Sequence, residues 1–179
     1  TPGSGNYWHA VVSANGYLIT WGSETPATWR YDPVADAWTQ LADCPTVISG
    51  GAYEAVNGTC YSFGNASDKT GTIYAFDVAA GSWSTLTVAL IPARYCGSAA
   101  VANGRIFVCG GFTESGDSPA VEEFDPVTRT LTPRAPLPEA SSYATAGGIR
   151  NKVYYAGGFS NAGVGSLDTC YEFDPALNQ

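Results

Sequence analysis

The sequence of 179 residues contains no methionine, a single histidine and only eight lysines and arginines against sixteen acidic residues. Because a complete reading frame begins with methionine, we expect a processed chain or a piece of a longer one. His9 alone, without any C-x-x-C spacing, argues against a zinc site and against a Ser-His-Asp arrangement, so we expect no metal and no cofactor. The net charge of −8 argues against nucleic-acid binding, which needs a basic surface. No apolar run reaches about 18 residues, so no membrane span is expected.

The residues that are abundant favour short strands and tight turns. Glycine occurs 21 times, aromatic residues make up 13% of the chain and apolar residues 45%. Long amphipathic runs of helix-forming residues are missing. This composition predicts an all-β domain with glycine-rich turns.

Two short patterns recur along the chain. The first is a hairpin tip, in which Asn-Gly, or Arg150-Asn151 in the last copy, fits a two-residue turn with positive φ at both positions. Its four copies are SANGYLITWGS (13–23), AVNGTCYSFGN (55–65), VANGRIFVCGG (101–111) and GIRNKVYYAGG (148–158). The second pattern ends in aspartate, whose side chain can accept hydrogen bonds from backbone amides ahead of it. Its copies are WRYDP (29–33), YAFDV (74–78), EEFDP (122–126) and YEFDP (171–175).

Together the two patterns predict four strands per repeat, here called a to d. Strand b, as in RIFVCGGF (105–112) and KVYYAGGF (152–159), is apolar on both faces and ends in glycines. We expect such a strand to lie between neighbours on both faces, and the glycines to mark places with no room for a Cβ. Repeated four-stranded sheets, each covered by the next, predict β-propeller blades.

The ordered set of Gly-Gly, apolar-Asp-Pro and a large apolar residue six positions later resembles the kelch repeat, over most of the chain from Tyr7 to Pro175. The large residues are Trp38, Trp83 and Leu131. The predicted organisation is an N-terminal tail (1–6) and four-stranded antiparallel blades at about 7–45, 46–93, 94–140 and 141–179. Since the fourth copy reaches Gln179 before its strand d, we expect an arc of a larger propeller, completed by further blades or another chain.

Cysteines and glycosylation sequons favour a secreted protein. The five cysteines allow disulfides among Cys44, Cys96 and Cys170, while Cys96 and Cys109 are placed diagonally in one hairpin, which is poor for a disulfide. In that hairpin Cys109 is predicted to face Ser98. Two N-glycosylation sequons begin at Asn57 and Asn65.

The b–c and d–a loops of a propeller share one face, and here they combine aromatic and charged residues, as protein interfaces do. The resemblance implies that Arg94, in the PAR segment before strand a, faces a ligand. The predicted ligand-binding residues are Arg94, Tyr95, Phe112, Glu114, Asp117, Phe159, Asn161, Tyr143, Trp29 and Lys69.

The predicted function is that of a non-enzymatic, extracellular binding or assembly module that contacts protein or glycan through this face. One alternative is part of a carbohydrate-active propeller enzyme, of sugar oxidase or sialic-acid mutarotase type, with catalytic residues in other blades. Another is a structural subunit that polymerises through an open blade edge.

Overall fold

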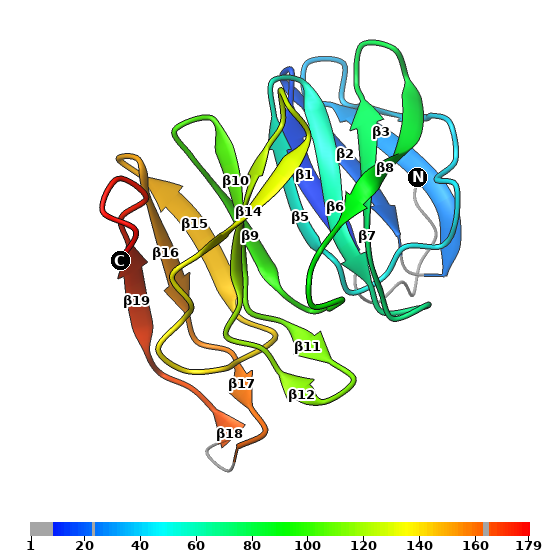
Figure 1. Cartoon of the computed structure of the whole chain (residues 1–179). Helices are drawn as coiled ribbons and strands as arrows, with labels where there is room; N and C mark the ends of the chain where they lie inside the picture. The colour runs from blue at the N-terminus through cyan, green and yellow to red at the C-terminus, as the bar shows by residue number, and fades with distance from the viewer. Residues whose placement is uncertain (1–8, 23, 163–164) are drawn as a thin grey trace.

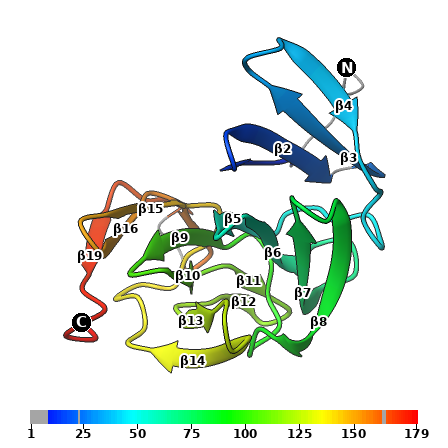
Figure 2. The same cartoon turned by 90° about the horizontal axis from the view of Figure 1, so that it is seen from above.

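A computed structural model shows that the chain forms strands, turns and loops throughout the described residues, which are 9–22, 24–162 and 165–179. Four antiparallel sheets, here called sheets one to four in chain order, follow one another as an open arc (Figures 1 and 2). The all-β fold of propeller blades is therefore confirmed. The predicted tail, residues 1–6, and Tyr7 lie outside the described residues. Within the described ranges, no helix has the length and apolarity needed to cross a membrane.

Three sheets have four strands and sheet four has three, each in the order of the chain. Sheet one contains β1 (Ala10–Ala14), β2 (Tyr17–Gly22), β3 (Thr25–Asp32) and β4 (Ala37–Gln40), and sheet two contains β5 (Ala52–Val56), β6 (Thr59–Asn65), β7 (Thr70–Asp77) and β8 (Ser82–Ala89). Sheet three contains β9 (Ser98–Ala102), β10 (Arg105–Cys109), β13 (Val121–Asp125) and β14 (Thr130–Arg134), and sheet four contains β15 (Thr145–Ile149), β16 (Lys152–Ala156) and β19 (Cys170–Phe173). Two small ribbons, β11 (Phe112–Thr113) with β12 (Gly116–Asp117) and β17 (Phe159–Ser160) with β18 (Gly165–Ser166), extend the b–c loops of sheets three and four.

The four predicted a–b turns are present. Asn103 and Gly104 have φ of 51° and 71°, and Arg150 and Asn151 have φ of 51° and 64°. In the Asn-Gly pairs of sheets one and two, both residues also have a positive φ. Both central residues with positive φ define the type I′ turn, whose twist matches that of the flanking strands. The register that follows places Cys109 opposite Ser98, as predicted.

The aspartate that ends each strand c starts a tight turn. The Asp125 carboxylate accepts hydrogen bonds from the amides of Val127 and Thr128 at 2.8 and 3.2 Å. Asp32 and Asp77 each accept two equivalent bonds, and the Asp174 carboxylate accepts one from the amide of Ala176. The predicted role of these aspartates is confirmed, with or without a following proline.

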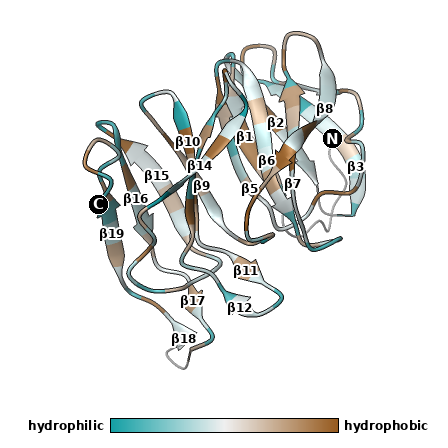
Figure 3. Ribbon diagram, viewed as in Figure 1, coloured by the Kyte–Doolittle hydropathy of each residue, from teal (hydrophilic) through white to brown (hydrophobic). Residues whose placement is uncertain are grey.

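Three hydrophobic clusters, here called the 1–2, 2–3 and 3–4 cores, lie between successive sheets. Figure 3 shows hydrophobic residues concentrated along the strands that line them. Their large buried members include Trp21 and Phe76 in the 1–2 core, Phe63 and Phe124 in the 2–3 core, and Phe107 and Tyr155 in the 3–4 core. Each such side chain stabilises the fold by roughly 1.5–3 kcal/mol relative to exposure.

Strand b is buried on both faces where a sheet has neighbours on both sides. In β10 every residue from Ile106 to Cys109 is buried, whereas in β16 buried and partly buried residues alternate. Glycines end strand b because the next segment crosses close by. A Cβ built on Gly110, which has a φ of 62°, would lie 2.6 Å from the carbonyl oxygen of Ser141. Gly110 is therefore required by crowding as well as by backbone conformation, whereas a Cβ on Gly157, its equivalent in sheet four, would make only an ordinary contact at 3.7 Å.

The outward faces of sheets one and four expose apolar side chains. Val11 and Leu18 of sheet one are 61% and 39% exposed, and Ile149 of sheet four is 59% exposed. The corresponding faces of the inner sheets are covered by a neighbour. The expectation that further blades or another chain complete the arc stays a prediction.

Candidate functional site

The b–c loops and the segments that lead from one sheet into the next meet at one end of the strands. Between sheets two and three they enclose an open pocket of about 700 Å³, here called the loop pocket. Its lining consists of Lys69, Pro92, Ala93, Thr113, Glu114, Ser115, Asp117, Ser118 and Pro119. The structure thus brings three predicted ligand residues, Lys69, Glu114 and Asp117, together from two different sheets.

Local turns position the charges of this pocket. Lys69 has a φ of 55° and follows Asp68, whose carboxylate accepts hydrogen bonds from the amide and hydroxyl of Thr70 at 3.1 and 2.8 Å. The side chains of Lys69 and Glu114 are exposed. A positive and a negative group are therefore both available to a partner at this pocket.

Asp117 lines the loop pocket and also connects two loops through hydrogen bonds. Its carboxylate accepts hydrogen bonds from the Ser142 hydroxyl at 2.6 Å and from the Asn161 amide at 2.6 Å. These bonds tie the b–c loop of sheet three to two segments of sheet four. Asn161 therefore contacts Asp117 through its backbone amide, and the residue is otherwise exposed.

Arg94 lies in the interior instead of at the surface. Its side chain is 1% exposed, and its guanidinium forms an ion pair with the 5%-exposed side chain of Glu122 at 2.5 Å. It also donates hydrogen bonds to the carbonyl oxygens of Gly110 at 2.8 Å and Val108 at 3.3 Å. The implied role of Arg94 in facing a ligand is thus not seen: its donors are used inside sheet three, beneath the loop pocket.

Alignment of the four repeats indicates that Arg94 and Glu122 form a pair. Glu122 stands where the other strands c have the aromatic residues Trp29, Tyr74 and Tyr171. Arg94 likewise occupies the position of Ile48 in sheet two, which is fully buried. A charge at each of two positions that are buried in sheet two, those of Ile48 and Tyr74, predicts an internal ion pair, because isolated buried charges are costly.

The predicted aromatic residues divide into two groups. Tyr95 and Phe112 are neighbours through backbone hydrogen bonds in both directions, and their ring centroids lie 5.8 Å apart. Phe159 occupies the equivalent place in sheet four and is 40% exposed. These rings lie on the loop face. Trp29, in contrast, lies within β3, opposite Thr20 and Gln40, and so is a strand residue of sheet one.

Tyr143 belongs to a second, smaller pocket of about 220 Å³ on the inner side of the arc, which is also lined by His9, Tyr53 and Cys96. Backbone hydrogen bonds connect three sheets there, because the Cys96 amide donates to Gly50 and the Tyr143 amide donates to Cys96. Desolvation, together with a hydrogen bond to Cys96, raises the pKa of the Tyr143 phenol to about 12. Tyr143 is therefore a neutral aromatic group at neutral pH, separate from the loop pocket.

The two predicted glycosylation sites differ in structure. Asn57 is exposed in the a–b turn of sheet two, with a φ of 52°. Asn65 is fully buried, and its side-chain amide donates to the carbonyl oxygen of Val47 at 3.1 Å. Its oxygen accepts hydrogen bonds from the amides of Ser49 and Ser67. A glycan on Asn65 would break these hydrogen bonds, so the structure is compatible with a glycan at Asn57 but not at Asn65.

The predicted disulfide is not present, since all five cysteines are free thiols. Four are buried, and Cys170 is exposed on β19. Burial raises the pKa of Cys44, Cys60 and Cys109 to about 12, so these thiols are unreactive at neutral pH. Among the residues that the structure describes, no group of three or more His, Cys, Asp or Glu side chains could hold a metal ion.

Comparisons with known proteins agree with the repeat pattern. A family model described as the Kelch motif matches residues 93–138. Kelch-like protein 25 of Xenopus tropicalis is 32% identical over 149 residues, which are 80% of this chain and 24% of the relative. Kelch-like protein 35 of Homo sapiens is 30% identical over 141 residues, which are 78% of this chain and 24% of the relative. The chain thus spans about a quarter of the length of these relatives.

A solved structure shows the same fold. The structure of YjhT has a TM-score of 0.86 and covers 99% of this chain, which in turn covers 65% of that structure. The sequence identity is 19%, so this likeness concerns the fold alone. The repeated turns and strands, the Kelch motif match and the Kelch-like relatives together show that the chain belongs to the kelch-repeat β-propeller family.

Proposed function

We propose that this chain is a protein-binding module and that the loop pocket is its contact site. The observation that carries the proposal is the meeting of exposed Lys69 and Glu114 in one open pocket built by two sheets. The Tyr95 and Phe112 rings lie in the segments next to it. Aromatic anchors surrounded by charged groups are typical of protein interfaces, and the Kelch-like relatives support the same class of function.

A glycan is the second candidate ligand of the loop face. The exposed rings of Phe159 and Tyr143 favour it, because they present flat apolar surfaces next to polar loops. The Tyr143 ring also combines an apolar body with a polar hydroxyl, which suits partners that are themselves amphipathic.

The double variant Lys69→Ala/Glu114→Ala is expected to weaken binding to selected partners by about tenfold or more, because each side chain presents a charge in the pocket. Peptides are first selected from a displayed library on the native chain, a labelled glycan array is screened in parallel, and affinities are measured by titration. The control is Val34→Ala, since Val34 is 95% exposed in a c–d turn at the opposite end of the strands. Equal loss in the control and the pocket variant, or none in either, contradicts the loop pocket as the contact site.

We also propose that the protein is extracellular and carries a glycan at Asn57. Support comes from the exposure of Asn57 in a turn, where an oligosaccharide can extend into solvent. The mass of the protein from its natural source is expected to fall on enzymatic deglycosylation, with conversion of Asn57 to aspartate in the released peptide. An unmodified Asn57 peptide, or a glycan on buried Asn65, would speak against this proposal.

A further inference from the structure

The segment that connects β8 to β9 forms one wall of the loop pocket. Pro92 and Ala93 line the pocket, and residues 91–93 are exposed. The chain is buried on either side of them, because Leu90 belongs to the 2–3 core and Arg94 is 1% exposed. An exposed apolar wall thus lies between two buried side chains.

The Arg94–Glu122 ion pair holds this wall in place. Glu122 Oε2 accepts a hydrogen bond from the Arg94 guanidinium at 2.5 Å, and Glu122 Oε1 accepts one from the Ile91 amide at 3.3 Å. The Arg94 guanidinium also donates to the Pro92 carbonyl oxygen at 3.3 Å. Within the described part of the chain, the backbone of residues 91–93 makes no further hydrogen bond. The wall is therefore hydrogen-bonded to the interior through this pair.

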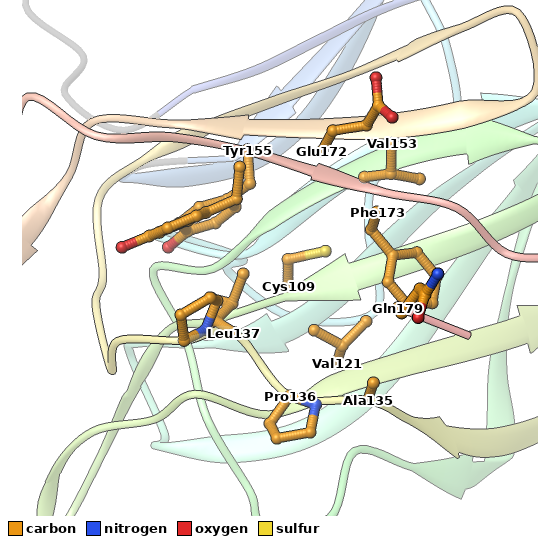
Figure 4. Close-up of a pocket in the computed structure, with 12 residues that line it drawn as sticks. Cys109, Val121, Ala135, Pro136, Leu137, Val153, Tyr155, Glu172, Phe173 and Gln179 are labelled. Carbon is orange, nitrogen blue, oxygen red and sulfur yellow. The ribbon is translucent and has the colours of Figure 1, made fainter. Parts of the chain in front are cut away.

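Neutral groups hold the equivalent segments at the other sheets. Between β4 and β5, the Val47 carbonyl oxygen accepts a hydrogen bond from the side-chain amide of Asn65 at 3.1 Å. Between β14 and β15, the hydroxyls of Ser141 and Tyr155 lie 3.0 Å apart. Tyr155 and Leu137, which belongs to the same segment as Ser141, both line a pocket of about 280 Å³ (Figure 4). The buried charges are thus particular to the wall of the loop pocket.

Stability alone does not explain a charged pair at these positions. Sheet two has Ile48 and Tyr74 there, and both are buried. Replacing a buried ion pair by apolar residues of similar volume often leaves stability unchanged or raises it. The charges add direction instead, since charge-assisted hydrogen bonds are short and fix the geometry of the groups that they join. Here those groups include the backbone of a pocket wall.

We propose that Arg94 and Glu122 are positioning residues of the loop pocket, which hold Pro92 and Ala93 as a fixed surface for one apolar side chain of a partner peptide. This inference rests on the proposed function of the pocket. Neither charged side chain contacts the partner, because both are buried beneath the wall. A wall that is already ordered raises the affinity, because less conformational freedom is lost on binding.

The native chain tests whether the pair holds the wall. Hydrogen exchange is measured by NMR for the amides of Ile91 and Ala93, two exposed residues of the same wall. The Ile91 amide has Glu122 as its acceptor, whereas the Ala93 amide has no acceptor among the described residues. After correction for sequence effects, the Ile91 amide is expected to exchange at least about tenfold more slowly, because hydrogen bonds to charged groups are strong. Equal protection of the two amides would overturn the proposal.

The variant Arg94→Ile/Glu122→Tyr installs the neutral residues of sheet two and removes both hydrogen bonds to the wall. The Ile91 amide should then exchange as fast as the Ala93 amide, while the amides of β9 stay within about threefold of their native rates because the sheet is retained.

The same variant should bind the peptides selected on the native chain at least about tenfold more weakly. Replacing the apolar anchor of such a peptide by alanine should then cost little more, since both changes remove one contact. The control Arg134→Ala breaks an exposed ion pair of the same sheet and should bind within about threefold of the native chain.

The pocket variant Lys69→Ala/Glu114→Ala separates this inference from the proposed function. If it weakens peptide binding and Arg94→Ile/Glu122→Tyr does not, the positioning role is overturned and the loop pocket remains the contact site. If the pocket variant binds as the native chain does, the proposed function is contradicted. The exchange comparison needs no partner, so in that case it still decides whether the pair holds the wall.

Discussion

Replacing Arg94 by alanine is expected to lower the free energy of unfolding by about 3–5 kcal/mol, because the substitution leaves the Glu122 carboxylate buried without a counter-charge. The carbonyl oxygens of Gly110 and Val108 lose their donors at the same time. Urea denaturation followed by tryptophan fluorescence measures the loss. A loss this large would identify Arg94 as a residue that holds sheet three together beneath the loop pocket.

Two further variants separate burial from charge. Arg134→Ala breaks the ion pair of Arg134 with Glu123, whose side chains are 29% and 15% exposed, and should cost at most about 1 kcal/mol. Arg94→Ile/Glu122→Tyr installs the residues that sheet two has at these positions, Ile48 and Tyr74, and should recover much of the stability. If Arg94→Ala costs no more than Arg134→Ala, the Arg94–Glu122 pair is not buried in solution.

Replacing Gly110 by alanine is the second change with a large expected effect, about 2–5 kcal/mol of unfolding free energy, from left-handed strain together with overlap. Gly110 has a φ of 62°, and the new Cβ would lie 2.5 Å from the Tyr155 hydroxyl and 2.6 Å from the Ser141 carbonyl oxygen. The tyrosine can move, but the Ser141 oxygen belongs to the backbone of the segment that leads from β14 into sheet four. Thermal and urea unfolding measure the change.

Gly104→Ala is the matched control, because Gly104 has a φ of 71° but no atom within 4 Å of the built Cβ. It should cost about 1–2 kcal/mol, which is the strain alone. The difference between the two variants reports the close approach of sheets three and four. Equal losses would mean that backbone conformation, and not crowding, explains the glycine.

The parts of the fold that were predictable from the sequence depend on neighbouring residues. The a–b turns form where Asn-Gly tolerates positive φ, and the register of each hairpin follows from its turn, so Cys109 faces Ser98 as expected. The Asp125 carboxylate binds amides two and three residues ahead. Since the same short patterns occur four times, the order of strands and the kelch resemblance followed from local chemistry.

The positions that were misjudged depend on contacts distant in sequence. Arg94 was predicted to be an exposed loop residue because it lies in the segment before β9. Its partner Glu122 is 28 positions away, and both side chains are buried. Asn65 has the sequence of a glycosylation site, but the preceding segment folds over it and uses its amide. A single-sequence motif carries no information about which backbone groups will cover it.

The sequence by itself determined the strands, their turns and the repeating sheet, because these require only alternation, glycine and aspartate at fixed spacing. Only the tertiary structure decided which charges remain at the surface. The loops of sheets two and three bring Lys69, Glu114 and Asp117 into one pocket, and the packing of sheet four on sheet three leaves another pocket, of about 280 Å³, beside Phe173. Both sites depend on how neighbouring sheets stack, and stacking distance and angle are set by all the side chains between them, not by any one segment.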